Sequence, residues 1–558
     1  MLRMLLLQLC ASSAVATSLS LKVGRPLPSR AVAPEYPPAA SALQKKFLDW
    51  DMTAFIHFSI TTFTGAQTGT QDPTKFAPPA ATLNVSQWVA TVKAMGAKVA
   101  VLTSKHEAGF CLWPTKTSSV NFSIAMSPTV GHRDLIREFT DACKAQDMLA
   151  GLYFTPPDPY TVEVLKHPEG SPAHTAAQLA QMEELTTNYG PLSYIWFDHY
   201  GLRTSSKDPT CVIGSCPARC TTNGAKCGYP EPLNRTFAKL AQIVRKNQPG
   251  AVILGQDTKQ TGGESGYAPY PLWYYCNTRI YEYSNAANAT VLAPLSNCMS
   301  NTTVGVAGAP LGRFFKAPES DCSIYDGCHP WFANDKAPVQ SLDTMMLHYE
   351  LTVGRGAEYI LNVPPSTKGI IGPREAAAAA ALGKEVKRRY PGGHGMPSLA
   401  DPHTANITST LKPGSWLQTR VKPFKVVGAV GTFSRVWLGE DVYTDGQRVM
   451  SYRLEAGSEC TQTPNGGCKS WKFLNSSYNS MHTALSAANI PRRWNATAAN
   501  LANITGATIG VRHIEGYDKH TVGQCGVRAE MVRFTLLSSV GNQPATIKMM
   551  VSDPICSE

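Results

Sequence analysis

Beyond its first twenty residues, the sequence has no apolar run as long as a membrane-spanning helix and no basic run longer than a few residues. The first absence predicts a soluble mature chain without a membrane span. The second argues against nucleic-acid binding despite the net charge of +11, because no basic stripe with interleaved aromatic residues is present. We expect the densest basic cluster, Lys384–Arg389, to be a solvated helix face. A weaker attraction to acidic polysaccharide stays open.

Several cofactor and metal motifs are also missing. No Gly-x-Gly-x-x-Gly follows the first predicted strand, which argues against a dinucleotide-binding fold. The chain has no His-Glu-x-x-His, and its first predicted strand has no His-x-His. A metal-dependent hydrolase is therefore the weaker alternative, and we predict neither a metal nor an organic cofactor.

The N-terminus has the pattern of a cleaved targeting signal. Arg3 precedes the apolar run Met4–Cys10, and Ala14–Ala16 fits the small-x-small cleavage rule, which predicts a signal peptide over residues 1–16. Nine Asn-x-Ser/Thr sequons agree with passage through a secretory lumen. We expect the protein to be secreted, or to be kept in a lysosome-like or vacuole-like lytic compartment.

Cysteine usage fits the same route, because an even fourteen of the 15 cysteines remain after signal cleavage. The expected local pairs are Cys322–Cys328 and Cys460–Cys468. Cys111 and Cys143 lie in apolar surroundings and are expected to stay free. A further four cysteines form one insertion, in which disulfides are favoured over zinc because the spacing suits zinc poorly: Cys211, Cys216, Cys220 and Cys227.

Strand and helix patterns alternate from Met52 to about Arg389, which predicts a parallel sheet. The expected strands are Ala54–Phe58, Lys98–Thr103, Leu149–Phe154, Leu192–Phe197, Val252–Gly255, Arg313–Ala317 and Tyr359–Val363. The expected helices are Val85–Met95, His132–Gln146, His174–Asn188, Pro232–Asn247, Ser341–Val353 and Pro373–Arg389. This many units favour an α/β fold with a closed, distorted (β/α)8-type barrel over an open doubly wound sheet.

The periodicity changes after Tyr390–His403, a linker rich in proline, glycine and histidine. The short strands expected beyond it are Val426–Leu438, Gln447–Glu455, Ser470–Leu474, Thr508–Val511 and Met531–Leu537. They predict a C-terminal antiparallel β-sandwich. The expected domains are thus a barrel over residues 17–395 and a sandwich over residues 396–558, which either binds sugar or packs against the barrel.

Polar residues recur where the barrel strands are expected to end, and ligands bind at that end of such barrels. Asp198 closes the apolar run Leu192–Phe197, although strand-end aspartates often only cap the next loop. His57, His106 and Tyr153 occupy similar positions. A lone histidine there is more often a core residue, but several such groups on one face are harder to attribute to packing.

Further carboxyl groups follow later strands. Glu264 comes after the fifth expected strand, and Glu319 after the sixth. Paired carboxylates with aromatic walls suit glycoside hydrolysis, in which one attacks or stabilises the oxocarbenium ion and the other protonates the leaving oxygen. In that case His57, His106 and Tyr153 would bond sugar hydroxyls, while two indoles would stack on the ring, those of Trp113 and Trp196.

Several sequence blocks resemble the α-L-fucosidases of glycoside hydrolase family 29, over roughly Asp49 to Gly369. The blocks are Thr62–Pro73, Val101–Pro114, His132–Leu135, Trp196–Asp198, Val353–Gly356 and Leu361–Pro365. The first and last are most similar to the subgroup associated with α-1,3/1,4-linked fucose. The resemblance implies a distorted barrel followed by a β-sandwich, in agreement with the pattern above.

The resemblance also implies residue roles. The family's nucleophile falls on Asp198, within a Trp-x-Asp motif, and its acid/base falls on Glu264 in preference to the alternative Glu319. The segment from Ala317 to Trp331 and Phe332 resembles the family's aglycone-side loop, which makes Trp331 a candidate substrate contact. His57, His106 and Tyr153 match residues of the sugar pocket. The implied activity is retaining release of α-L-fucose from a fucosylated oligosaccharide or glycoconjugate.

Some pocket positions depart from the family pattern. Glu107 stands where the family has a second histidine, and His199 stands where it has glycine. Lys259–Gln260 replaces Arg-Trp, and Ala66–Gln67 lies where Glu-Trp is usual. These changes alter the pocket wall, with Glu107 placing an acid among the substrate contacts. They motivate an alternative from another class, a catalytically impaired, fucose-binding, lectin-like protein.

Overall fold

The computed structural model describes the chain from residue 40 to residue 552, with gaps. The residues outside the description are 1–39, 66–70, 157–158, 169–170, 199–203, 206–207, 213–230, 263, 271, 277–313, 398–399, 401–403, 422–430, 446, 462–466, 475–508, 518–525 and 553–558. The predicted signal peptide, His199, Ala66–Gln67 and the pairing of the Cys211–Cys227 insertion fall on these residues and stay predictions.

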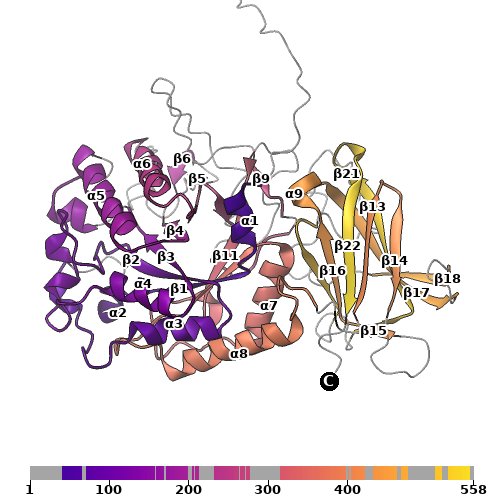
Figure 1. The fold of residues 1–558 in the computed structure, drawn as a ribbon, viewed down its shortest axis with the longest axis horizontal. Helices are drawn as coiled ribbons and strands as arrows, with labels where there is room; N and C mark the ends of the chain where they lie inside the picture. The colour runs from indigo at the N-terminus through magenta and orange to yellow at the C-terminus, as the bar shows by residue number, and fades with distance from the viewer. Residues whose placement is uncertain are drawn as a thin grey trace, which may run out of the picture. The chain divides into compact units, whose positions relative to one another are not determined.

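An eight-stranded sheet forms the centre of the barrel, in the order β7-β4-β3-β2-β1-β12-β11-β8 (Figure 1). Its strands are β1 (Met52–Ile56), β2 (Val99–Lys105), β3 (Leu149–Phe154), β4 (Tyr194–Phe197), β7 (Val252–Ile253), β8 (Thr258–Gln260), β11 (Ala317–Ser323) and β12 (Glu358–Asn362). All neighbours pair in parallel. A bridge between Leu254 and Thr258 links the two ends of this order. The predicted distorted barrel is therefore confirmed.

Helices lie along the outside of this sheet, as parallel strands buried on both faces require (Figure 1). They are α1 (Ala42–Leu48), α3 (Val85–Ala94), α4 (Leu135–Ala145), α5 (Pro172–Asn188), α6 (Glu231–Asn247), α7 (Leu342–Thr352) and α8 (Pro373–Arg389). Polar side chains just before several helices accept N-terminal backbone N–H groups, as Asn84, Asp134 and Ser341 do. Within the described part of the chain, no helix combines the length and apolar character needed to cross a membrane.

The sixth expected strand, Arg313–Ala317, is wrong. Phe314–Phe315 is β10, which pairs antiparallel with β9 (Tyr275–Cys276), and the barrel strand β11 only begins at Ala317. All seven residues of β11 are buried although its sequence is polar. Its inward side chains are satisfied by hydrogen bonds rather than by apolar packing, so its hydrophobic signal is weak. Glu319 consequently lies within a strand and not after one.

The C-terminal region has two four-stranded antiparallel sheets, β13-β22-β16-β19 and β14-β21-β17-β18 (Figure 1). The strands are β13 (Ala405–Leu411), β14 (Trp416–Arg420), β16 (Arg435–Glu440), β17 (Val449–Cys460), β18 (Cys468–Phe473), β19 (His513–Gly516), β21 (Met531–Ser539) and β22 (Ala545–Ser552). The sheets enclose their own apolar core, which confirms the predicted sandwich. The expected strand at Thr508–Val511 is wrong, because residues 510–511 form a turn before β19. The domain boundary at 395/396 falls between α8 and β13 and stays a prediction.

Buried charges join the barrel helices to the sandwich. The carboxylate of Glu350 on α7 accepts hydrogen bonds from Arg435 of β16 at 2.8 and 3.1 Å, and from the Tyr390 hydroxyl at 2.6 Å. Asp51, just before β1, contacts Arg512 at 2.7 Å and His394 at 2.8 Å. Burial alone would raise the pKa of Asp51, but the Arg512 charge and the hydrogen bond of His394 hold it below its usual value. These contacts agree with the expectation that the sandwich packs against the barrel.

Candidate active site

Asp198 directly follows β4, at the carboxyl end of the barrel. Its backbone N–H donates to the Phe154 carbonyl at 3.1 Å, and its side chain is half-buried. The hydroxyl of Tyr153, from the neighbouring strand β3, donates to Asp198 Oδ2. Burial and the adjacent Asp198 charge raise the pKa of Tyr153 well above its usual value. The phenol therefore stays protonated and fixes one of the two carboxylate oxygens of Asp198.

Two imidazoles lie beside this pair. His57 follows β1 and His106 follows β2, and their ring centroids are 5.4 Å apart. His106 stacks on Tyr153 at 5.4 Å, and Trp196 stacks on Tyr153 at 4.8 Å. The structure thus brings together the strand-end residues that the sequence predicted, in one aromatic cluster around Asp198.

The protonation state of His57 follows from its surroundings. Burial and the nearby His106 lower its pKa to about 3, so the ring is neutral at physiological pH. Asn362 Nδ2 donates to the Trp331 carbonyl at 2.7 Å, which turns its Oδ1 toward His57 Nδ1 at 2.9 Å. Because an amide oxygen only accepts, Nδ1 carries the proton. Nε2 is then an acceptor, suited to a sugar hydroxyl.

Trp331 and Phe332 form a wall against the imidazoles. The Trp331 ring lies 5.2 Å from that of His57, and the Phe332 ring lies edge-on to His106 at 5.0 Å. Glu107, which replaces the family's second histidine, is half-buried, and its charge contributes to the raised pKa of Tyr153. Trp331 and Glu107 therefore belong to the same cluster.

Glu319 occupies the barrel interior beneath the cluster. It is 1% exposed, and its carboxylate accepts hydrogen bonds from the Trp196 indole at 2.7 Å and from the Tyr194 hydroxyl. Burial raises its pKa to about 7 although these donors act in the opposite direction. The carboxyl group thus anchors Trp196 from below.

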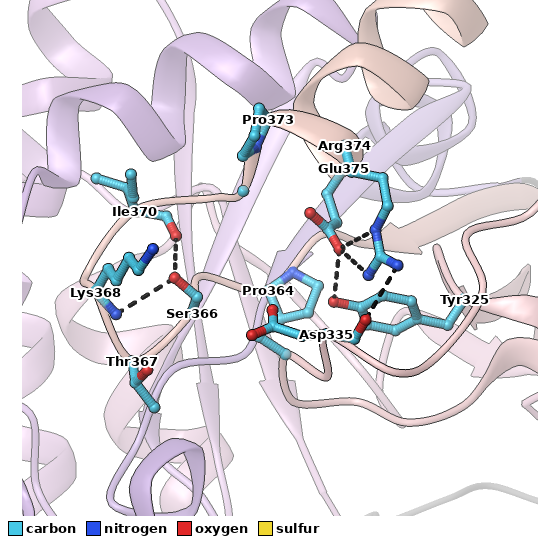
Figure 2. Close-up of a pocket in the computed structure, with 12 residues that line it drawn as sticks. Tyr325, Asp335, Pro364, Ser366, Thr367, Lys368, Ile370, Pro373, Arg374 and Glu375 are labelled. Atoms are coloured by element: carbon cyan, nitrogen blue, oxygen red, sulfur yellow. Dashed lines mark hydrogen bonds and ion pairs between the residues drawn. The ribbon is translucent and has the colours of Figure 1, made fainter.

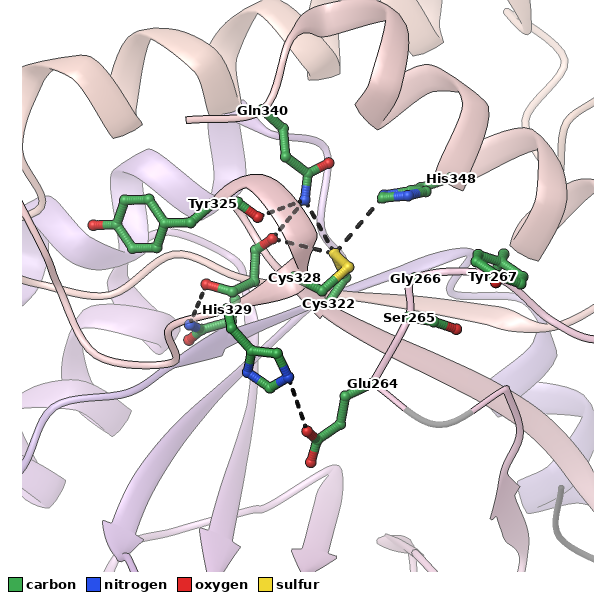
Figure 3. The surroundings of a disulfide bond; sticks show 12 residues. Glu264, Ser265, Gly266, Tyr267, Cys322, Tyr325, Cys328, His329, Gln340 and His348 are labelled. Atoms are coloured by element: carbon green, nitrogen blue, oxygen red, sulfur yellow. Dashed lines mark hydrogen bonds and ion pairs between the residues drawn. A yellow bond between two sulfur atoms is a disulfide. The ribbon is translucent and has the colours of Figure 1, made fainter. Parts of the chain in front are cut away.

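Glu264 lies in the loop after β8 and is 41% exposed at its side chain. Its Oε2 is 3.4 Å from Nε2 of His329 (Figure 3). The His329 ring is in turn edge-on to that of Trp331, with centroids 5.6 Å apart. Burial and the charge of Glu264 raise the pKa of Asp321 well above its usual value. Contacts therefore run continuously from Glu264 through His329 and Trp331 to the imidazoles beside Asp198.

Trp113 lies elsewhere. It is 1% exposed, and its indole N–H donates to Glu184 of α5 at 2.8 Å. The same carboxylate accepts from the Thr115 hydroxyl and the Lys116 N–H, so these contacts fix the loop after β2 against a helix. The structure does not bring Trp113 into the ring contacts of the Asp198 cluster.

Sequence reasoning missed Asn362, Phe332, Asp321 and His329 as site residues. Asn362 ends β12 and the strand-end rule could have found it. Asp321 lies inside an unrecognised strand, and His329 lies in a loop whose partner Glu264 is remote in the chain, so neither carried a local signal.

A hollow of about 340 Å³ lies by the start of α8, lined by Tyr325, Asp335, Pro364, Lys368, Arg374, Glu375 and their neighbours (Figure 2). Glu375 accepts from Arg374 at 2.7 Å and from Tyr325 at 3.1 Å, so these three side chains satisfy one another. Its lining includes none of the residues predicted from the sequence.

Among the described residues, Cys322, Cys328 and His348 have donor atoms close enough together to hold a metal. The two sulfurs form the predicted disulfide, however, and the thiolates that a metal would need are consumed. The second predicted pair, Cys460–Cys468, is also present, and Cys111 and Cys143 are buried and outside any disulfide, as expected.

Comparison with known proteins gives a consistent result. The family model described as alpha-L-fucosidase matches residues 73–300. An α-L-fucosidase homologue of Oryza sativa subsp. japonica is 30% identical over 340 residues, or 60% of this chain and 56% of the relative. Alpha-L-fucosidase 1 of Arabidopsis thaliana is 29% identical over 346 residues, or 61% of this chain and 58% of the relative. The match thus spans little more than half the length of these relatives.

Solved structures share the fold. A glycoside hydrolase 29 family member from an unknown rumen bacterium has a TM-score of 0.65 at 24% identity, covering 93% of this chain and 78% of that one. A Ruminococcus gnavus GH29 fucosidase in complex with fucose has a TM-score of 0.65 at 18% identity, covering 93% and 95%. The family model and the plant relatives thus make the chain similar in sequence to the α-L-fucosidases, and the solved structures show that it shares the fold of glycoside hydrolase family 29 members.

Proposed function

We propose that this protein is a retaining α-L-fucosidase that releases terminal α-L-fucose from fucosylated glycans. The observation that carries the proposal is the position of Asp198 at the carboxyl end of β4, held by Tyr153 within a cluster of imidazole and indole rings. Carboxylates at that end of a (β/α)8-type barrel are placed for catalysis. The similarity to α-L-fucosidases supplies fucose as the sugar.

In the proposed reaction Asp198 attacks the anomeric carbon and forms a glycosyl ester, while Glu264 protonates the departing glycosidic oxygen. Glu264 then removes a proton from water, which attacks the same carbon and releases fucose with its configuration retained. Tyr153 keeps Asp198 oriented, and Nε2 of neutral His57 accepts a hydrogen bond from a sugar hydroxyl. No step draws on a metal or an organic cofactor.

Exposure supports Glu264 over Glu319 as the acid/base. An acid/base must reach the glycosidic oxygen and water, and the side chain of Glu264 is 41% exposed beside the aromatic wall. Glu319 is buried, with both carboxylate oxygens engaged by Tyr194 and Trp196. The raised pKa of Glu319 suits a proton donor. Its position beneath Trp196, however, suits a residue that holds the Trp196 indole in place.

The test is a panel of aryl glycosides, with an α-L-fucoside compared against a β-D-galactoside and an α-L-arabinoside. We expect the fucoside to be the preferred substrate, with α-L-fucose as the first product by NMR. First release of the β-anomer would overturn the retaining mechanism. Fucose binding by calorimetry without hydrolysis of any substrate would instead favour the lectin-like alternative. Trisaccharides with α-1,3- or α-1,4-linked fucose test the subgroup assignment.

We also propose that the chain matures in the secretory pathway and works outside the cell or in a lytic compartment. The disulfides Cys322–Cys328 and Cys460–Cys468 support this, because such bonds persist in oxidising compartments. A loss of apparent mass on treatment with an N-glycosidase, and an N-terminus near residue 17 by Edman sequencing, are the expected results. An unglycosylated chain that keeps residues 1–16 would contradict the proposal.

A further inference from the structure

We propose that His329 is a positioning residue for Glu264, holding one oxygen of its carboxyl group so that the other faces the glycosidic oxygen. The inference rests on the proposed function. It concerns a loop residue that the sequence did not identify as part of the site. Its evidence is the contact at 3.4 Å between His329 Nε2 and Glu264 Oε2, together with the way each residue is mounted (Figure 3).

The backbone on either side of Glu264 is fixed to β11. Thr261 N–H donates to the Glu319 carbonyl at 2.7 Å, and Gly266 N–H donates to the Asp321 carbonyl at 3.0 Å. Gly266 has a φ of +75°, and a Cβ there would lie 2.9 Å from Cys322 Cβ. The loop is thus pressed against the disulfide, while the Glu264 side chain itself projects into partly exposed space.

His329 is mounted on the same disulfide from the other side. Cys328 immediately precedes it and is bonded to Cys322 of β11. The carbonyl of Pro330, just after it, accepts from Ser323 Oγ at 2.7 Å, and the next carbonyl, that of Trp331, accepts from Asn362 at 2.7 Å. The chain on both sides of the histidine is therefore held, at Cys328, Pro330 and Trp331. The imidazole itself, 54% exposed, is directed at Glu264 (Figure 3).

A glutamate on a fixed backbone still has three rotatable side-chain bonds, and proton transfer requires its oxygen within hydrogen-bond reach of the leaving group. A contact on Oε2 from a rigidly mounted ring removes much of that freedom and leaves Oε1 for the substrate. Stability alone gives this contact little reason to exist, because pairs between exposed side chains contribute little to folding.

The experiment compares two aryl α-L-fucosides that differ in their need for protonation. The 2-chloro-4-nitrophenyl group leaves without an acid, whereas the phenyl group requires one. For His329→Ala we expect kcat/KM to fall roughly 10- to 100-fold on phenyl fucoside but less than about threefold on the activated substrate. His329→Gln, which keeps an N–H donor, should restore most of the loss.

His394→Gln is the matched control. His394 also contacts a carboxylate, that of Asp51 at 2.8 Å, but at the amino end of β1. This variant should leave the ratio between the two substrates unchanged. Equal losses on both substrates in His329→Ala, or no loss on phenyl fucoside, would overturn the positioning role. A wild-type protein that hydrolyses neither fucoside would instead overturn the proposed function.

Discussion

Two regions of the molecule bury carboxyl groups with different partners. One is the mouth of the barrel, meaning the carboxyl ends of its strands and the interior just beneath them, and the other is the contact between the barrel helices and the sandwich. The hydrogen-bond donors to these carboxyl groups are neutral in the first region and include charged groups in the second. At the sandwich contact, Glu350 and Asp51 face the guanidinium groups of Arg435 and Arg512. At the mouth, Asp198 accepts a hydrogen bond from a phenol, and in the barrel interior beneath it Glu319 accepts from a phenol and an indole. Neutral donors satisfy hydrogen bonds without cancelling the carboxyl charge.

The pKa directions follow this difference. Nearby positive charge holds the pKa of Asp51 below its usual value despite burial. Burial raises the pKa of Glu319 to about 7, and that of Asp321 well above its usual value. The Arg512 guanidinium therefore helps to keep Asp51 in the charged form, which serves stability. The mouth keeps carboxyls whose protonation can change, which serves acid and base chemistry.

Asp198→Asn should have the largest effect on activity, and it should abolish the chemistry at the mouth without disturbing the sandwich contact. An amide cannot form the glycosyl ester, so we expect kcat on an aryl α-L-fucoside to fall by roughly 10³-fold or more. Initial rates check this, with thermal unfolding to confirm that the fold is intact. The control is Asp326→Asn, at an exposed position in the loop after β11. For Asp198→Gly, added azide should yield β-L-fucosyl azide, and a near-normal rate in Asp198→Asn would exclude the nucleophile role.

Glu350→Ala should weaken the contact between the barrel and the sandwich, and so lower stability, without affecting catalysis. It leaves Arg435, which is 3% exposed at its side chain, buried without its partner. Removing one member of a buried ion pair typically costs about 3–5 kcal/mol of unfolding free energy. Urea titration measures this, and kcat of the folded fraction should stay close to wild type.

The matched control for Glu350 is Glu385→Ala, because Glu385 contacts Arg389 and Arg388 within α8 and its side chain is more exposed than that of Glu350. These hydrogen bonds lower the pKa of Glu385 to about 2, but ion pairs within one helix contribute only about 0.3–0.5 kcal/mol. Equal destabilisation by the two variants would show that burial does not distinguish the barrel–sandwich contact from a pair within one helix.

Glu264→Gln and Glu319→Gln sharpen the comparison within the mouth. For Glu264→Gln we expect kcat/KM on phenyl α-L-fucoside to fall roughly 10²- to 10³-fold, because the general acid is lost. For Glu319→Gln we expect less than about a tenfold fall, together with a lower melting temperature, because Trp196 and Tyr194 lose a carboxylate acceptor. The reverse ranking of kcat/KM would transfer the acid/base role to Glu319.

Much of the barrel was predictable because its strands and helices carry local signals. β3 and α8 have the expected bounds, since one is a short apolar run and the other a long helix with proline at its start. The residues that end apolar strands, His57, Tyr153 and Asp198, were found by the same logic. β8 was missed because three residues, Thr258–Gln260, give no periodicity.

The rest of the site depends on tertiary contacts that no local pattern records. β11 is polar because its inward side chains bond across the barrel, so Glu319 looked like a loop residue. His329 meets Glu264 because a disulfide and two loops bring remote segments together. Trp113 shows the converse, since its indole is committed to Glu184 although its sequence block matches the family.

Substitution of His57 has the smallest expected effect, a change in how the unfolding free energy depends on pH. Its pKa is about 3 in the folded protein, against an ordinary 6.5, because it is buried and lies near His106. The unfolded chain therefore binds a proton at His57 that the folded chain does not, whenever the pH lies between these values. Stability from the neutral ring is complete above pH 6.5 and is lost as the pH falls toward 3. At pH 5 the loss is about 2 kcal/mol.

His57→Asn should therefore lower the unfolding free energy at pH 7.5, by lost packing, but should flatten its pH dependence. We expect the decrease between pH 7.5 and pH 5, measured by urea titration, to be about 2 kcal/mol smaller than in the wild type. His132→Asn, at an exposed position, controls for removal of one imidazole. An unchanged decrease in His57→Asn would mean that the buried imidazole titrates alike in both states. The mouth would then resemble the sandwich contact, where a partner charge outweighs burial in setting the pKa of Asp51.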